Sequence, residues 1–138
     1  MQNFSRDATQ FTPCISFDCQ SNELTLRGNS YPEDPAAFYA PVFAWLREYL
    51  GQLEYDAEVR VNIEIAYFNS SSSKVLLDFF DLLNDKAFNE AVPIDVNWYY
   101  DPDDPDMLEY GEDFQSDFRA MKFRFIKQEY ANPSSRQS

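Results

Sequence analysis

The sequence predicts an α/β sandwich, in which helices pack on a mixed β-sheet. Apolar side chains occupy every second position of residues 60–67, a pattern typical of a half-buried strand. Apolar side chains at helical spacing follow over residues 74–84. With 44% hydrophobic and 17% aromatic residues, the chain of 138 residues can form one core. The predicted order of elements is strand, strand, helix, strand, helix, strand, helix, strand.

The chain is expected to fold as a single domain over residues 12–127. Residues 1–11 are largely polar and show no periodicity, so we expect a flexible N-terminal arm there. Residues 128–138 are expected to form a flexible tail. Short alternating strands over 12–18 and 23–27, joined by polar residues 19–22, predict that the domain opens with a hairpin.

The first helix is predicted to follow a turn at residues 28–33. Asp34 supplies a capping carboxylate, and Pro35 suits the first helical position. Pro41 lies inside the apolar stripe, where its missing N–H predicts either a kink or a helix that properly begins near Ala40. Gly51 is placed to end this helix.

A corner then joins the central strand to the second helix. The alternating side chains of this strand are Val61, Ile63, Ile65 and Tyr67. Asn69 and four consecutive serines follow, and such side chains satisfy the free amides at a helix start. Those amides and the helix dipole also tolerate a phosphate. The serines therefore either cap the helix only or also carry a regulatory phosphate.

The second helix has more apolar surface than one sheet face needs. Its polar stripe is narrow and consists of Lys74, Asp78, Asp81 and Asp85. The wide apolar remainder is covered either by neighbouring helices or by a docked partner. Val75 and Leu82 flank the polar stripe, so a partner is expected to contact them.

The last third of the chain predicts a strand over 92–100, a helix over 107–118 and a strand over 121–127 with a basic outer face. Residues 101–106 contain four aspartates, a composition similar to that of a calcium-binding loop. Pro105 takes the place of the fifth-position ligand, however, and no glycine follows it. We therefore expect no metal site here but a solvated loop that caps the next helix.

The composition argues against several classes of function. A net charge of −13 and a pI near 4.2 argue against nucleic acid or an anionic membrane as a partner. The three glycines do not form a phosphate-binding loop, and without histidine the commonest general base and zinc ligand are missing. We expect a protein that is not an enzyme and has no cofactor. Two cysteines and no apolar leader favour a reduced, cytoplasmic protein.

Three stretches of the sequence resemble one family when they are taken together. They are Gly-Asn-Ser-Tyr-Pro-Glu at 28–33, Tyr-Phe-Asn-Ser-Ser-Ser at 67–72 with Lys74 after it, and Asp-Phe-Phe-Asp-Leu-Leu at 78–83. Over residues 12–127 the chain resembles the SiaC family of bacterial regulatory phosphoproteins. This resemblance implies a fold similar to the STAS fold of anti-sigma-factor antagonists.

The resemblance also implies a partner-switching function in cyclic-di-GMP signalling and biofilm control. In the family, a serine/threonine protein kinase and a PP2C-type phosphatase set the phosphorylation of one hydroxyl after Tyr-x-Asn. The unphosphorylated form binds and activates a diguanylate cyclase. The matching position is Ser70, where the best-known member has threonine, and Ser71 and Ser72 are the alternatives. The residues expected to bind partners are Tyr31, Pro32, Glu33, Asn69, Lys74, Val75, Asp78 and Leu82.

A phosphate on Ser70 is expected to act by repulsion and steric block at an interface rather than by refolding the corner. Two other classes of function are open. The high negative charge also suits a constitutive acidic inhibitor or immunity-type protein, which would bind a basic target with steep salt dependence. An enzyme that uses Glu33 with an aspartate of residues 101–106 finds no support in the spacing.

Overall fold

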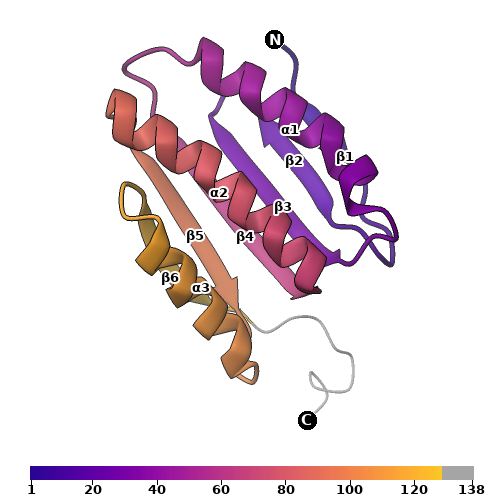
Figure 1. The fold of residues 1–138 in the computed structure, drawn as a ribbon. Helices are drawn as coiled ribbons and strands as arrows, with labels where there is room; N and C mark the ends of the chain where they lie inside the picture. Colours follow the sequence, from indigo (N-terminus) through magenta and orange to yellow (C-terminus); the bar gives the residue numbers. More distant parts are fainter. Residues whose placement is uncertain (129–138) are drawn as a thin grey trace.

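The computed structural model describes residues 1–128. Within this range the elements are β1 (Phe4–Arg6), β2 (Cys14–Asp18), β3 (Glu23–Ser30), α1 (Pro35–Gln52), β4 (Val59–Phe68), α2 (Ser70–Glu90), β5 (Ile94–Tyr100), α3 (Pro105–Asp117) and β6 (Lys122–Lys127). The strands form one sheet in the order β1-β2-β3-β4-β5-β6 (Figure 1). The pairs β1–β2 and β2–β3 are antiparallel, and the three following pairs are parallel. The predicted hairpin and the mixed sheet are confirmed.

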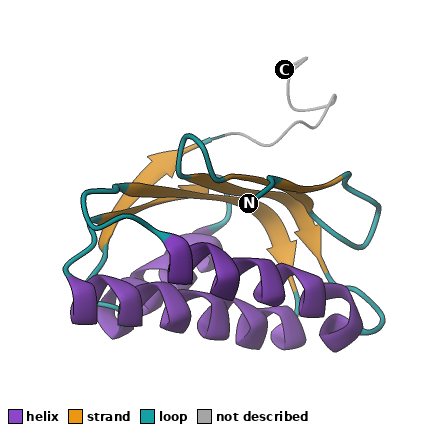
Figure 2. Cartoon of the chain, turned by 90° about the horizontal axis from the view of Figure 1, so that it is seen from above, coloured by secondary structure: helices purple, strands orange, loops and turns teal. Residues whose placement is uncertain are grey.

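The helices lie together on one face of the sheet, so the fold has two layers (Figure 2). This arrangement confirms the predicted α/β sandwich, whereas the resemblance to the STAS fold stays a prediction. Each parallel connection runs through a helix, as a crossover between parallel strands requires. The core fills the space between the two layers, and its largest fully buried side chains include Trp98, Tyr49, Phe17 and Phe80.

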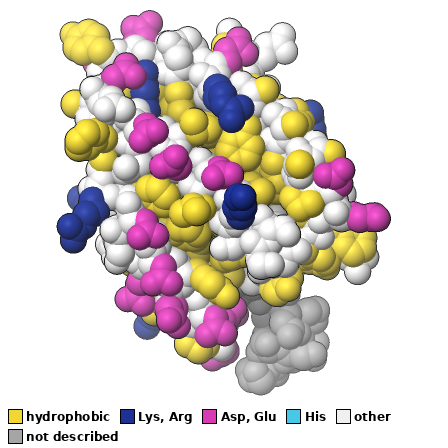
Figure 3. All heavy atoms as spheres, in the orientation of Figure 1, with side chains coloured by type: hydrophobic (Ala, Val, Ile, Leu, Met, Phe, Trp, Pro, Cys, Tyr) yellow, Lys and Arg dark blue, Asp and Glu magenta, His cyan; other side chains and the backbone are white. Residues whose placement is uncertain are grey.

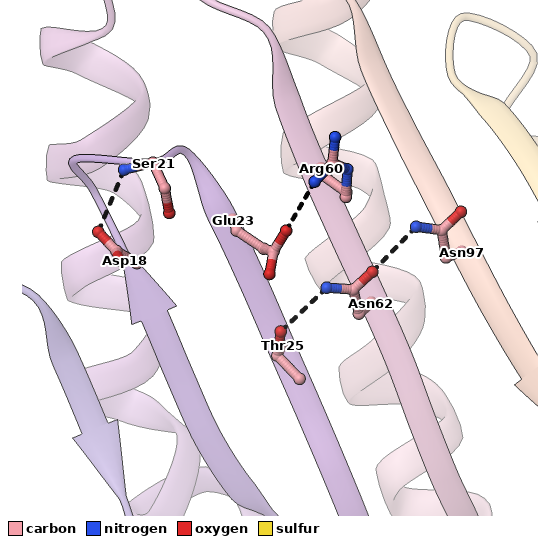
Figure 4. Close-up of polar contacts among 7 residues, drawn as sticks. All are labelled: Asp18, Ser21, Glu23, Thr25, Arg60, Asn62 and Asn97. Atoms are coloured by element: carbon pink, nitrogen blue, oxygen red, sulfur yellow. Dashed lines mark hydrogen bonds and ion pairs between the residues drawn. The ribbon is translucent and has the colours of Figure 1, made fainter.

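The outer face of the sheet is polar. The Asn62 side-chain amide donates to Thr25 Oγ1 at 3.1 Å, and the Asn97 amide donates to Asn62 Oδ1 at 2.9 Å (Figure 4). Arg60 pairs with Glu23 at one end of this row. Polar side chains therefore alternate with core apolar ones along β3, β4 and β5, the pattern of a sheet with one polar face, although Asn62 and Glu64 on that face are each only 8% exposed.

The N-terminal residues are not the flexible arm that the sequence predicted. Phe4–Arg6 forms the edge strand β1 and pairs with β2. The Phe4 ring lies 6.5 Å from the Trp45 ring, and Trp45 Nε1 donates to the carbonyl of Gln2 at 2.8 Å. A strand of three residues is too short to show alternation in the sequence, so this segment looked patternless. The predicted tail of residues 128–138 lies outside the described residues except for Gln128.

Helix α1 begins at Pro35, with Asp34 as its cap, so the expected later start near Ala40 is wrong. The Asp34 carboxylate accepts from the backbone N–H of Ala37 at 3.1 Å. Pro41 lies inside the helix, and both Pro41 and Ala37 are exposed. An exposed position lowers the cost of this proline, because water can take the place of a missing hydrogen-bond donor there. The helix also continues one residue past Gly51.

Tyr67 does not share a face with Val61, Ile63 and Ile65, as the alternation predicted. Gly28 pairs with Ile65, but the next residue, Asn29, pairs with Tyr67. The extra residue in β4 reverses the alternation, because a bulge turns the following side chains to the other face. Tyr67 is consequently 54% exposed, and Phe68 takes the buried position.

Candidate functional site

The corner between β4 and α2 has the capping geometry that the sequence predicted, with Asn69 as the cap. The Asn69 side-chain oxygen accepts from the backbone N–H of Ser72 at 3.0 Å, and its carbonyl accepts from the N–H of Ser73 at 2.9 Å. The four serines are therefore the first four residues of α2 rather than its cap. The four serines thus lie in the first turn of α2, at the positive end of the helix dipole.

The four serines differ in exposure. Ser70 and Ser71 are exposed, Ser73 is half-buried, and Ser72 is 1% exposed. A modifying enzyme can reach the first two hydroxyls. Ser72 was expected as an alternative phosphorylation position, but its burial argues against that role because a dianion there would be removed from water at a high cost.

Ser72 belongs to a buried chain of hydroxyls. Ser30 Oγ lies 2.8 Å from Ser72 Oγ and 2.6 Å from Tyr39 Oη. Burial raises the pKa of Tyr39. The carbonyl of Ser30 also accepts from the backbone N–H of Asn69 at 3.2 Å. Ser30 thus ties the end of β3 to the start of α2 and to the first turns of α1.

The turn before α1 packs beside the corner. The Tyr31 ring lies 5.5 Å from the Tyr67 ring and 5.3 Å from the Phe11 ring, both edge to face. Pro32 is buried and Glu33 is exposed. Tyr31 and Glu33 are therefore placed where a partner could contact them, whereas Pro32 shapes the turn.

A groove of about 560 Å³ runs between α1 and α2. Ser71, Lys74, Val75 and Asp78 line it from α2, and a neighbouring hollow of about 250 Å³ adds Leu82. Four of the residues that the sequence predicted for partner binding therefore lie together here, namely Lys74, Val75, Asp78 and Leu82. In the space-filling view, apolar surface runs between acidic side chains on this helical face (Figure 3).

The opposite wall of the groove comes from α1 and was missed in the sequence. Tyr39, Phe43 and Arg47 line it, and Arg47 lines both hollows together with Asp78. The spacing of four residues places these three side chains along one face of the helix. That spacing alone does not indicate that α1 lies beside α2, because the contact between the two helices depends on how the whole chain folds.

Ser70 lies on the other side of α2 from the groove. It lines a hollow of about 270 Å³ together with Phe68, Asn69, Ser73 and Tyr110 of α3. The rings of Phe68 and Tyr110 lie 5.1 Å apart. The two exposed serines therefore face different surfaces, Ser71 the α1–α2 groove and Ser70 the α2–α3 side.

The described residues contain no group of three His, Cys, Asp or Glu side chains placed to hold a metal ion. Among the same residues, no helix is long and apolar enough to cross a membrane. What the helical face offers is an apolar groove with charged rims and two exposed hydroxyls at a helix start. These features are those of a protein-binding domain.

Comparison with known proteins gives the family. The family model described as SiaC family regulatory phosphoprotein matches residues 6–128. The chain is also 31% identical, over 117 residues, to an uncharacterized protein of Pseudomonas aeruginosa strain UCBPP-PA14, covering 85% of this chain and 90% of that protein. The chain belongs to the SiaC family of regulatory phosphoproteins, which are regulators and not enzymes.

Solved structures of family members agree with this assignment. Apo-SiaC from Pseudomonas aeruginosa superimposes with a TM-score of 0.77 at 28% identity, covering 94% of this chain and 100% of that one. SiaC in the complex with the diguanylate cyclase SiaD, which it activates, gives a TM-score of 0.81 at 27% identity, covering 91% and 99%. The predicted family and the expectation of a non-enzymatic regulator are confirmed.

Proposed function

We propose that this chain binds and activates a diguanylate cyclase in its unphosphorylated form, and that phosphorylation of Ser70 switches this activity off. The proposal rests on one observation above all: Ser70 is an exposed hydroxyl on the first turn of the helix whose other face lines the docking groove. A related SiaC is an activator in complex with the cyclase SiaD, which supports a cyclase as the partner.

The cyclase is proposed to dock on the helical layer, over the α1–α2 groove and the start of α2. Val75 and Leu82 are half-buried beside Phe43 and supply apolar contact, and Lys74 and Asp78 supply charged contacts at the rim. Apolar contacts flanked by charges are the usual composition of an interface centre and its rim. Tyr31 and Glu33 extend this surface beyond the start of α1.

The switch follows from the charge and bulk of a phosphate. Phosphoserine carries about −1.5 to −2 charges at neutral pH. The free amides of the first turn of α2 tolerate this charge, so the corner keeps its fold. A partner that covers Ser70 would have to desolvate the dianion, and this cost together with the added volume releases the partner.

A serine/threonine protein kinase and a PP2C-type phosphatase are proposed to set the state of Ser70. Ser71 is the alternative position, because it is also exposed and lines the groove itself. Ser72 is not proposed, because its hydroxyl is buried against Ser30.

The test is a binding measurement with the SiaD-like diguanylate cyclase of the same genome. Wild-type protein and Ser70→Ala are expected to bind alike, whereas Ser70→Asp is expected to bind weakly. Ser16→Asp is the matched control, because Ser16 is exposed on the outer face of the sheet. Equal binding by wild-type protein and Ser70→Asp, with steep salt dependence, would instead favour a constitutive acidic inhibitor.

A further inference from the structure

Tyr110 of α3 joins the Ser70 hydroxyl to a group of carboxylates. Tyr110 is 45% exposed and lines the hollow of about 270 Å³ that contains Ser70. The same side chain lines a second hollow of about 240 Å³, whose other lining residues are Asp106, Glu109 and Asp113. We call Ser70, Tyr110 and these three carboxylates the Tyr110 surface.

The chemistry of the Tyr110 surface suits a cationic ligand. Three carboxylates and an exposed aromatic ring line it, and among residues 1–128 no lysine or arginine lines either of its two hollows. A Lys or Arg side chain can pair with the carboxylates and lie over the ring at the same time. The α1–α2 groove differs, because Arg47 and Lys74 line it together with its acidic residues.

An enzyme that modifies Ser70 comes close to this surface, because Ser70 and Tyr110 line one hollow. A phosphatase can hold its substrate by the phosphate dianion itself. A kinase meets a neutral hydroxyl, so its binding energy has to come from the surrounding surface. The acidic rim is present before phosphorylation and is therefore available to the kinase.

We propose that the Tyr110 surface is the docking site for a basic segment of the kinase that phosphorylates Ser70. This inference rests on the proposed function. It implies that the kinase recognises residues about 40 positions away from Ser70 in the sequence. Only the folded domain brings these residues beside the hydroxyl. The kinase should then discriminate by the fold and not by the sequence around the serines.

The experiment measures the initial rate of Ser70 phosphorylation by quantitative phosphopeptide mass spectrometry. A clarified extract of the native cells, supplied with ATP, is the source of the kinase. The test variants are the pair Glu109→Gln with Asp113→Asn, and Tyr110→Ala. Their matched controls are Glu112→Gln with Asp117→Asn, exposed on α3 outside both hollows, and Tyr55→Ala, exposed in the loop after α1.

Each test variant is expected to slow phosphorylation about tenfold, whereas its control keeps the wild-type rate. The wild-type rate should fall as salt rises, and the Glu109/Asp113 variant should lose most of this dependence. A synthetic peptide of residues 62–80 should react about a hundredfold more slowly than the folded protein. Cyclase binding by the test variants should stay within about threefold of wild type.

Three results would overturn the inference. They are equal rates for test and control variants, efficient phosphorylation of the peptide, and loss of cyclase binding with unchanged phosphorylation. The last result would assign the Tyr110 surface to the cyclase. If wild-type Ser70 is never modified, the proposed function fails as well, whereas normal modification of all variants overturns only this inference.

Discussion

Ser30 and Ser72, 42 residues apart in the chain, are joined by a buried hydrogen bond of 2.8 Å between their hydroxyl oxygens. Tyr39 completes the chain of hydroxyls at 2.6 Å from Ser30. This contact connects the turn at 28–33 with the serine corner, two of the three stretches that carry the resemblance to the family. It also connects both walls of the groove, because Tyr39 belongs to α1 and Ser72 to α2.

Removing the middle hydroxyl should destabilise the protein more than removing either end. Ser30→Ala leaves the hydroxyls of Tyr39 and Ser72 without this partner, and we expect a loss of about 1–3 kcal/mol in the free energy of unfolding. Ser72→Ala keeps the Ser30–Tyr39 hydrogen bond and should cost about 1 kcal/mol. Urea denaturation measures both, with Ser73→Ala as a control within about 0.5 kcal/mol of wild type. A neutral Ser30→Ala would show that the chain of hydroxyls contributes nothing to stability.

Two glycines in helices should respond to alanine with opposite signs. A Cβ at Gly111 would lie 2.6 Å from Trp98 Nε1 and 2.8 Å from Phe125 Cε1. Trp98 cannot easily move away, because Nε1 donates to the Met107 carbonyl at 3.0 Å. Gly111→Ala should therefore lower stability by about 1–3 kcal/mol despite better helix propensity.

Gly51→Ala is the matched substitution, because within residues 1–128 a Cβ at that position would meet no atom within 4 Å beyond its chain neighbours and the adjacent backbone of its own helix. It should raise stability by up to about 1 kcal/mol. Thermal denaturation of both variants checks the pair, and an unchanged melting temperature for Gly111→Ala would contradict the close approach of α3 to the sheet.

Charge reversal in the groove should weaken cyclase binding. Asp78 lines both hollows between α1 and α2, near Arg47. We expect Asp78→Arg to reduce affinity about tenfold or more, because it places like charges together at the interface. Asp85→Arg is the control, since Asp85 is exposed on α2 outside the groove. Surface plasmon resonance with the immobilised cyclase measures both, and equal affinities would exclude the groove from the interface.

Alkaline pH should destabilise the fold through Tyr49. Its hydroxyl donates to Asn22 Oδ1 at 2.7 Å, and burial raises its pKa above the ordinary value of about 10. A raised pKa in the folded state means that the stabilisation is complete below about pH 10 and is lost as pH rises further. Urea titrations between about pH 8 and pH 11 should show this fall, and a shallower one for Tyr49→Phe. The same slope in both proteins would refute the assignment to Tyr49.

The elements that the sequence predicted well are those whose signal is local. The alternation in 60–65, the Asp34-Pro35 helix start and the capping corner at Asn69 all depend on neighbours in the chain. Strand β1 was not predicted, because three residues are too few to show the alternation of a strand. The reversed orientation of Tyr67 was not predicted either, because the position of a bulge depends on the pairing with the partner strand.

The candidate site was predicted on α2 only. Lys74, Val75, Asp78 and Leu82 follow from the periodicity of one helix, whereas Phe43 and Arg47 join them through packing of a second helix. Tyr110 reaches Ser70 through the placement of α3, and Ser72 is buried by its contact with Ser30. Each of these relations joins segments far apart in the chain, so no local pattern reports it.

The most direct measurement of the central claim is the rate of cyclic-di-GMP synthesis by the purified cyclase in the presence of this protein. Two forms should be compared, the unmodified protein and one with phosphoserine incorporated at position 70. The account predicts that the unmodified form accelerates synthesis and that the phosphorylated form, folded to the same extent by circular dichroism, leaves the basal rate unchanged. Equal acceleration by both forms would contradict it.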